Sequence, residues 1–231
     1  MKKLVLFDID GTILLSAGAG RRAIIAALAT ELDHSEAWEQ VRFDGKTDPQ
    51  ILLELFAAAG HADPPTAERL ESLGRRYVSL LQAELALPHH RTTVLPGIPE
   101  LLSALEAEPY VVVGLLTGNF VEGAALKLRS AGILPERFKV GAYGSDAAQR
   151  SALPPIAAAR AHQFFGRVPH GSEVVIVGDT PSDVTCGLGI NARAIGVATG
   201  SYTMDDLRAA GAAAVFPDLA GTQDVLAAIL E

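Results

Sequence analysis

The sequence predicts an α/β protein with a Rossmann-like three-layer core, a mainly parallel sheet, and a group of helices inserted after the first strand. Three observations support this fold class. Residues 3–9 form an apolar, strand-like run, residues 19–86 are rich in Ala and Leu at helical spacing, and short apolar runs alternate with helical segments after residue 96. Because fully apolar strands need helices on both faces, the alternation indicates a buried parallel sheet.

The first of these elements is the strand over residues 3–9, and the helical region follows it. Residues 19–86 contain little that resembles a strand, and we expect three to five helices there. Asp48 is expected to cap one of them, because it directly precedes Pro49, and Gly60 is expected to end that helix.

Five further strands, each followed by a helix, are predicted after Pro96 and Gly97. The strands are placed at residues 110–116, 138–142, 174–177, 194–197 and 214–215, and the helices end near residues 131, 165, 188, 210 and the C-terminus. The first strand must join the same sheet, so the helical region interrupts the core. We therefore predict a core domain of residues 1–16 and 92–231 and a helical cap domain of residues 17–91.

The composition argues against several classes of protein. The 231 residues are 49% hydrophobic with a net charge of −8 and a pI near 5.2, whereas nucleic-acid phosphates attract basic surfaces. No run approaches the roughly 18 apolar residues of a membrane span, and the short apolar run behind Lys2 and Lys3 does not resemble a signal peptide. Cys186 is the single cysteine, so no disulfide forms within the chain. We expect a cytoplasmic protein that binds neither nucleic acid nor membrane.

Polar residues cluster at the predicted ends of the strands. They are Asp8 and Asp10 after the first strand, Thr117, Gly118 and Asn119 after the second, Arg150 before the next helix, and Asp179 and Asp183 after the fourth. Open parallel sheets bind ligands beyond the carboxyl ends of their strands, so we expect these residues at one edge. Crowded carboxylates repel one another and favour a hard divalent cation, for which magnesium is the usual choice.

These residues resemble the motifs of the haloacid dehalogenase-like superfamily, in the branch with a C1 cap that includes phosphoglycolate phosphatases and β-phosphoglucomutases. The run Asp-Ile-Asp-Gly-Thr at 8–12 is similar to the first family motif, and Thr117 within Leu-Leu-Thr-Gly-Asn is similar to the second. Asp179, preceded by glycine, and Asp183 are similar to the fourth. The resemblance covers nearly the whole chain, and it includes the order of the motifs.

The resemblance implies a role for each acidic residue. Asp8 would attack phosphorus to form an aspartyl-phosphate and would also bind magnesium. Asp10 would protonate the leaving alkoxide and then activate water, a role for which its acidic surroundings should raise its pKa, and its backbone carbonyl would bind the metal. Asp179 would be the second carboxylate ligand, and Asp183 would hold a metal-bound water or orient its neighbours. Gly11 would supply the tight turn after Asp10.

The phosphoryl group is expected to bind the Thr117 hydroxyl and the backbone amides of Gly118 and Asn119 at a helix N-terminus. Helix capping by Thr117 would also explain this sequence. The usual motif lysine is absent. Arg150 is therefore expected to neutralise the nucleophile and the phosphate, and Arg160 is the alternative.

The resemblance implies a magnesium-dependent phosphatase that hydrolyses a small phosphomonoester, with phosphoglycolate as a family-level candidate, beneath a cap that excludes water and selects the substrate. Lys46 is predicted to contact the substrate, and Arg21 and Asp48 are further candidates in the cap. One alternative is a β-phosphoglucomutase-like phosphomutase, which is weakened because residues 17–29 contain no histidine. The other is a non-catalytic phospholigand-binding protein. The expected partner is a small phosphorylated metabolite, and both a monomer and a homodimer remain open.

Overall fold

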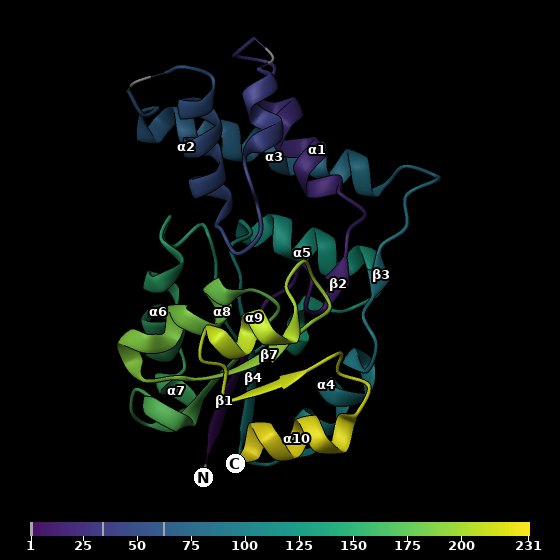
Figure 1. Cartoon of the computed structure of the whole chain (residues 1–231), viewed down its shortest axis with the longest axis vertical. Coiled ribbons are helices and arrows are strands. Elements are labelled where there is room, and N and C mark those ends of the chain that lie inside the picture. The colour runs from purple at the N-terminus through teal and green to yellow at the C-terminus, as the bar shows by residue number, and fades with distance from the viewer. Residues whose placement is uncertain (1, 34, 62) are drawn as a thin grey trace.

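The computed structural model describes residues 2–33, 35–61 and 63–231, and its centre is a six-stranded sheet in which every pairing is parallel (Figure 1). In spatial order the strands are β5 (Val140–Ala142), β4 (Val111–Leu116), β1 (Lys3–Phe7), β6 (Val174–Gly178), β7 (Arg193–Val197) and β8 (Ala214–Phe216). The predicted α/β fold class with a parallel sheet is therefore confirmed.

Helices surround this sheet and also extend beyond it. The α-helices are α1 (Ala19–Leu28), α2 (Asp48–Ala58), α3 (Ala67–Leu85), α4 (Ile98–Ala107), α5 (Val121–Ser130), α6 (Leu153–Arg160), α7 (His162–Phe165), α8 (Pro181–Cys186), α9 (Met204–Ala209) and α10 (Thr222–Leu230). Short 3-10 helices are η1 (Glu36–Gln40), η2 (Pro135–Arg137), η3 (Arg150–Ala152), η4 (Gly171–Glu173) and η5 (Gly187–Ile190). Within the described ranges, no helix has the length and apolar character needed to span a membrane.

Both faces of the sheet are buried, as a three-layer core requires. Side chains alternate along a strand, so Val5 and Phe7 of β1 point to one face and Leu4 and Leu6 to the other, and all four are inaccessible to solvent. The first face packs against α4, α5 and α10. The second face packs against α6, α7 and α8, and α9 covers the part near β7.

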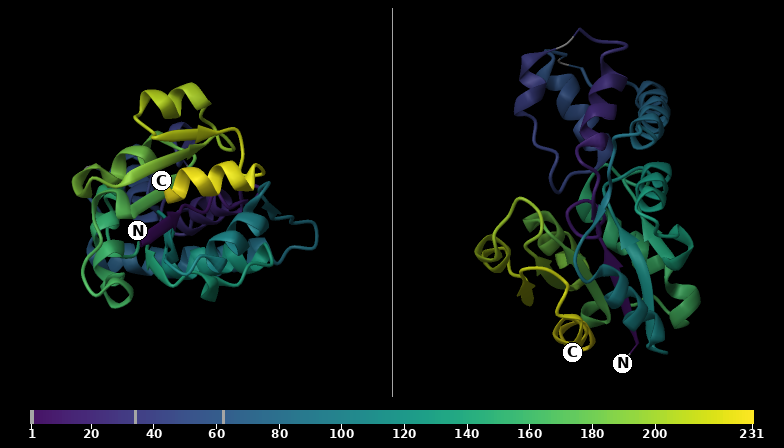
Figure 2. Two further views of the ribbon diagram at one scale, coloured as in Figure 1. Left: turned by 90° about the horizontal axis from the view of Figure 1, so that it is seen from below. Right: turned by 90° about the vertical axis from the view of Figure 1, so that its right-hand side faces the viewer.

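Helices α1, η1, α2 and α3 form a separate layer beyond the carboxyl ends of the strands, opposite the two chain termini (Figures 1 and 2). This helical group has its own apolar core, in which Trp38 and Tyr77 are each 1% exposed. The chain enters it through β2 (Leu14–Leu15) and leaves it through β3 (Thr93–Val94), and these two strands pair antiparallel. The expected helical content of this region is confirmed, whereas α4 and the β2–β3 pair were not predicted.

Two predicted helix starts are wrong. Thr47 rather than Asp48 caps α2, because the Thr47 side chain accepts a hydrogen bond from the backbone N–H of Gln50 at 3.2 Å. Asp48 is the first residue of that helix. The N-cap position of α5 is Phe120, so Thr117 does not cap it. The Asp48 carboxylate instead accepts a hydrogen bond from the distant N–H of Phe120, and the Thr117 hydroxyl accepts one from the side chain of Asn119.

The strand order explains where a site can form. The chain runs outward from β1 to β4 and β5, and then returns to the other side of β1 with β6, β7 and β8. Ligand sites of doubly wound sheets lie where the order reverses, which is here between the carboxyl ends of β1 and β6. Asp8 and Asp179 directly follow these two strands.

We expect Leu6→Ala to lower the free energy of unfolding by about 3 kcal/mol, because it empties a fully buried position in the central strand. Leu188→Ala is the matched control, since Leu188 is 68% exposed and its truncation should change stability by less than about 0.5 kcal/mol. Urea unfolding followed by circular dichroism measures both. Equal effects would contradict the burial of β1 at the centre of the core.

Candidate active site

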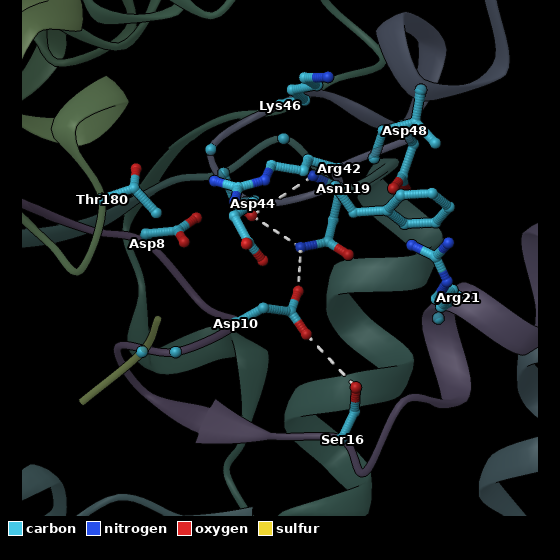
Figure 3. Close-up of a pocket in the computed structure, with 18 of the residues that line it drawn as sticks. Asp8, Asp10, Ser16, Arg21, Arg42, Asp44, Lys46, Asp48, Asn119 and Thr180 are labelled. Carbon is cyan, nitrogen blue, oxygen red and sulfur yellow. Dashed lines mark hydrogen bonds between the residues drawn. The ribbon is translucent and has the colours of Figure 1, made fainter. Parts of the chain in front are cut away.

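The predicted site residues converge at the carboxyl edge of the sheet. Apart from Asp183, all of them line one cavity of about 580 Å³ between this edge and the helical group (Figure 3). They are Asp8, Asp10, Lys46, Thr117, Gly118, Asn119, Arg150 and Asp179. Asp183 lies just beneath the others and is almost completely buried.

Three carboxylates form a buried acidic cluster, and two of them, Asp8 and Asp179, line the cavity. One oxygen from each of Asp8, Asp179 and Asp183 lies within 4.8 Å of the other two, and all three residues are buried. The two oxygens of Asp183 already have partners. Its Oδ1 pairs with Arg150, and its Oδ2 accepts hydrogen bonds from the backbone N–H and the hydroxyl of Thr180, the latter at 2.7 Å. Asp183 is thus arranged to orient its neighbours.

Arg150 provides the positive charge in this cluster. Its Nη2 lies 3.0 Å from Oδ1 of Asp8, in addition to its pairing with Asp183, and its side chain is buried. The alternative candidate, Arg160, pairs with Asp146 at 2.6 Å on the protein surface and does not line the cavity. Of the two arginines, Arg150 therefore has the position that the motif cation requires.

The electrostatics of the cluster fit a bound divalent cation. Burial, followed by the charges of Asp183 and Asp8, raises the pKa of Asp179 to about 9, although its hydrogen bond from Thr12 opposes the shift. Burial raises the pKa of Asp8 to about 6, against the opposing charge of Arg150. One guanidinium does not balance three buried carboxylates, and an all-oxygen donor set suits a hard cation.

Asp10 has a different environment from Asp8, although only one residue separates them. Burial alone would raise the pKa of Asp10, but the charge of Lys127 and hydrogen bonds from Lys127, Asn119 and Ser16 outweigh it and lower this pKa. The sequence-based expectation of a raised pKa is therefore wrong for this structure. The reason is a lysine that the sequence did not indicate. Because the Asp10 side chain faces Lys127, its backbone carbonyl is the group left for the proposed metal.

The segment 117–119 makes contacts that differ from a simple anion-binding helix terminus. The Asn119 side-chain amide donates to Oδ2 of Asp10 and to Oγ1 of Thr117, both at 2.8 Å. Helix α5 begins only at Val121. The prediction that Gly118 and Asn119 lie at a helix N-terminus is thus wrong by two residues. The chain between β4 and α5 instead places Asn119 between Asp10 and Thr117. Thr117 itself is fully buried.

The cap residues suggested by the sequence have mostly structural contacts. Lys46 lines the cavity but pairs with Glu54. Arg21 donates to the carbonyl groups of Trp38 and Val41 at 3.0 Å, so it supports the loop over residues 41–47. Asp48 lines the cavity as well. Burial raises its pKa to about 6, although the charge of Lys127 and the N–H of Phe120 oppose this shift.

The loop over residues 41–47, with the start of α2, is docked onto the sheet edge in this structure. The Thr47 hydroxyl donates to the carbonyl of Ala148 at 2.6 Å, the N–H of Asp48 donates to Gly118 at 2.7 Å, and the N–H of Phe120 donates to the Asp48 carboxylate at 2.8 Å. The approach is close enough that a Cβ on Gly118 would lie 2.1 Å from the carbonyl oxygen of Lys46. The structure is therefore a closed conformation.

Three polar residues of the site were not identified from the sequence. Lys127 on α5 contacts Asp10, Thr12 donates to Oδ1 of Asp179 at 3.1 Å, and Thr180 binds Asp183. Thr12 is the last residue of the first motif, although no role was assigned to it, and Thr180 directly follows Asp179, so their position in sequence was an available signal. Lys127 lies in the middle of a helix, where a lysine usually faces solvent, and no local pattern distinguishes it.

A parallel sheet with clustered aspartates at its switch point defines an α/β enzyme with an acidic catalytic edge. The chain belongs to the haloacid dehalogenase-like hydrolase family, whose model matches residues 2–189. It is 31% identical to the "Probable phosphatase IndB" of Dickeya dadantii, over 91% of this chain and 87% of the relative. It is 28% identical to the "Phosphoglycolate phosphatase" of Pseudomonas putida, over 90% and 78% respectively. A hydrolase structure from Pseudomonas syringae shares the fold, with a TM-score of 0.72, 21% identity and 98% coverage of both chains.

The carboxylate cluster predicts how the metal-free protein responds to pH. The folded-state pKa of Asp179, about 9, lies above the ordinary value of 3.8 for an aspartate, so its protonated form favours folding. This contribution is complete below about pH 4 and is lost as the pH rises through about 9. In the presence of a chelator, we therefore expect Tm to fall over this range. Magnesium at about pH 8 should raise Tm by several degrees.

Substitution separates the metal effect from the rest of the protein. Asp179→Asn should raise Tm in chelator at about pH 8, because asparagine is neutral without taking up a proton on folding, and it should abolish the increase caused by magnesium. Asp205→Asn is the control, since the Asp205 side chain is 91% exposed. Differential scanning calorimetry measures each variant. A magnesium shift that persists in Asp179→Asn would show that the metal binds elsewhere.

Proposed function

We propose that this protein is a magnesium-dependent phosphatase that hydrolyses a small phosphomonoester through an aspartyl-phosphate on Asp8. The observation that carries the proposal is the placement of Asp8 beside Arg150 and within the carboxylate cluster, facing the cavity. The relatives named as phosphatases support the same activity. We also propose that residues 17–91 act as the cap on a core of residues 1–16 and 92–231.

In the first step, Asp8 acts as the nucleophile. Arg150 holds Oδ1 of Asp8, whereas Oδ2 accepts no hydrogen bond from any described residue, so this oxygen is free to attack phosphorus. With a pKa of about 6, Asp8 is mostly ionised at neutral pH. An O–P bond forms to Asp8 as the bond from phosphorus to the leaving oxygen breaks. The leaving oxygen keeps the electron pair and takes a proton from Asp10.

In the second step, a water attacks phosphorus and Asp10 accepts its proton. The bond between phosphorus and Asp8 breaks, which releases phosphate and restores the carboxylate. The lowered pKa of Asp10 in this structure keeps its carboxylate ionised, which is the form that can accept a proton in this step. A phosphate dianion brings negative charge near Asp10, which raises the pKa of that carboxyl and favours the acid form for the first step.

Magnesium would be held by Asp8, Asp179 and the backbone carbonyl of Asp10, and it would supply positive charge that offsets the phosphate and the nucleophile. Asp183 would orient this group through its contacts with Arg150 and Thr180. The Thr117 hydroxyl and the amides of Gly118 and Asn119 remain our proposed phosphoryl ligands. Lys46 remains a proposed substrate contact, which would need to exchange its partner Glu54.

Phosphoglycolate is one candidate substrate, because several relatives carry the name phosphoglycolate phosphatase. The cavity of about 580 Å³ falls within the range of roughly 300–1,000 Å³ that accommodates drug-sized ligands, so it also admits larger phosphomonoesters such as sugar phosphates. The position of Arg150 supports catalysis over a purely phospholigand-binding role, because that alternative depended on a missing motif cation.

The central test is a panel of phosphoglycolate, sugar phosphates and nucleotides, assayed for phosphate release with magnesium and with chelator. We expect turnover of at least one substrate that chelator abolishes. Asp8→Asn should lower kcat by at least about 1,000-fold, because the nucleophile is lost. Activity that survives Asp8→Asn would exclude the aspartyl-phosphate. Transfer of phosphate between two sugar hydroxyls, in place of release to water, would indicate a phosphomutase.

The docked loop gives a second prediction. Gly118→Ala should lower kcat/KM by about 10- to 100-fold, because its Cβ would collide with the carbonyl of Lys46 and hold the cap open. Small-angle X-ray scattering should show a more extended molecule. Gly189→Ala is the matched control, since a Cβ there meets no atom within 4 Å. Unchanged scattering and kinetics in Gly118→Ala would show that the contact does not govern closure.

A further inference from the structure

Lys127 is a buried lysine whose ammonium group points into the candidate site from helix α5. It is 4% exposed, and its Nζ donates to Oδ2 of Asp10 at 2.6 Å and to Oδ1 of Asn119 at 2.7 Å. Asn119 in turn donates to the same oxygen of Asp10. The three side chains therefore close a ring, in which each one contacts the other two.

This ring gives the two oxygens of Asp10 different surroundings. Oδ2 accepts hydrogen bonds from both Lys127 and Asn119, and these two bonds use most of its capacity as an acceptor. Among the described residues, Oδ1 has only a long contact of 3.4 Å from the Ser16 hydroxyl. The Asp10 side chain is 39% exposed and lines the cavity (Figure 3). The ring thus fixes the carboxylate through one oxygen and leaves the other one available.

The helical group completes the enclosure of Lys127. A Cβ on Gly20, in the first turn of α1, would lie 3.2 Å from the Lys127 ammonium and 3.7 Å from the Tyr77 hydroxyl. The Tyr77 hydroxyl is also hydrogen-bonded to Asp48 at the start of α2. Tyr77 and Asp48 both line the cavity. Residues from α1, α2 and α3 therefore surround the ammonium in this structure.

We propose that Lys127 is a positioning residue, which anchors Oδ2 of Asp10 so that Oδ1 is the atom that exchanges the proton with the leaving group and with water. This inference rests on the proposed function, because it gives a role to Lys127 in the same acid–base steps. It adds a residue from α5 to the site and distinguishes the two oxygens of one carboxylate. Burial of a charged side chain is costly unless it is paired. Here the paired Lys127 holds the Asp10 carboxylate in a fixed orientation, which proton transfer to and from that group requires.

A second buried lysine provides the matched control. Lys3, at the opposite end of β1, is 2% exposed and donates to the carbonyl of Ser172 at 2.9 Å. Lys3→Met thus removes a buried ammonium from the far end of β1, where the side chain does not line the cavity. The variants to compare are Lys127→Met, Lys127→Arg and Lys3→Met, all with magnesium, using an alkyl phosphate that the wild type hydrolyses and p-nitrophenyl phosphate. The two substrates differ in whether the leaving oxygen needs a proton.

For the alkyl phosphate, we expect Lys127→Met to lower kcat about 100-fold and to change KM by less than about threefold, because acid–base catalysis is lost while binding is kept. For p-nitrophenyl phosphate, the nitrophenolate leaves without a proton, so the first turnover should remain a fast burst. Steady-state turnover should then be slow, because hydrolysis of the aspartyl-phosphate still needs Asp10 as a base. Lys127→Arg should restore part of kcat, since a guanidinium can also donate to both partners. Lys3→Met should retain wild-type kinetics.

Three results would overturn the inference. One is a loss in Lys127→Met that is equal for the burst and for the steady state, which would indicate general damage to the site. Another is a rise in KM with unchanged kcat, which would make Lys127 a substrate ligand. The third is wild-type kinetics.

If Lys127→Met does not fold, Lys127→Arg decides the question. An intact burst with a slowed steady state in Lys127→Arg supports positioning, and equal losses of both oppose it. A wild type that hydrolyses no phosphomonoester would instead refute the proposed function itself.

Discussion

The contact of Arg150 with both Asp8 and Asp183 is the interaction on which the candidate site depends. Three carboxylates are buried at the carboxyl edge of the sheet, and each would be costly to ionise without a positive partner. Arg150 partly offsets this cost and holds one oxygen of Asp8 in place. The remaining imbalance raises the pKa of Asp179 and accounts for the suitability of the site for a divalent cation.

The topology of the sheet makes this concentration of charge possible. Asp8 and Asp179 come from adjacent parallel strands that are far apart in sequence, and both strands end at the point where the strand order reverses. Gly11, with φ of 85°, turns the chain immediately after Asp10, and a Cβ there would lie 2.3 Å from an oxygen of Asp179. The loop after β1 thus passes so close to Asp179 that a side chain at this position is excluded.

Asp8 and Asp10 show how position in the tertiary structure separates two identical side chains. Asp8 lies among carboxylates with Arg150, and its pKa is raised. Asp10 lies against Lys127 and Asn119, and its pKa is lowered. The start of α2 adds further contacts around the same cavity, because Asp48 is hydrogen-bonded to the backbone of Gly118 and Phe120. The proposed nucleophile and the proposed proton carrier therefore differ in pKa because of their neighbours, although they belong to one short loop.

The sequence by itself determined the layered fold, the order of the strands along the chain, and the acidic motif residues at their ends. It could do so because apolar periodicity and strand-end polar residues are local signals that parallel-sheet geometry brings together. Helix starts at Thr47 and Phe120 were misplaced, since the Asp48 carboxylate accepts from Phe120 and the Thr117 hydroxyl accepts from Asn119. Only the tertiary structure decided the pairing of Asp10 with Lys127, the placement of Arg150 and not Arg160 beside Asp8, and the docking of the loop over residues 41–47. These depend on which side chains meet across separate elements, and no local pattern in the chain encodes such distances.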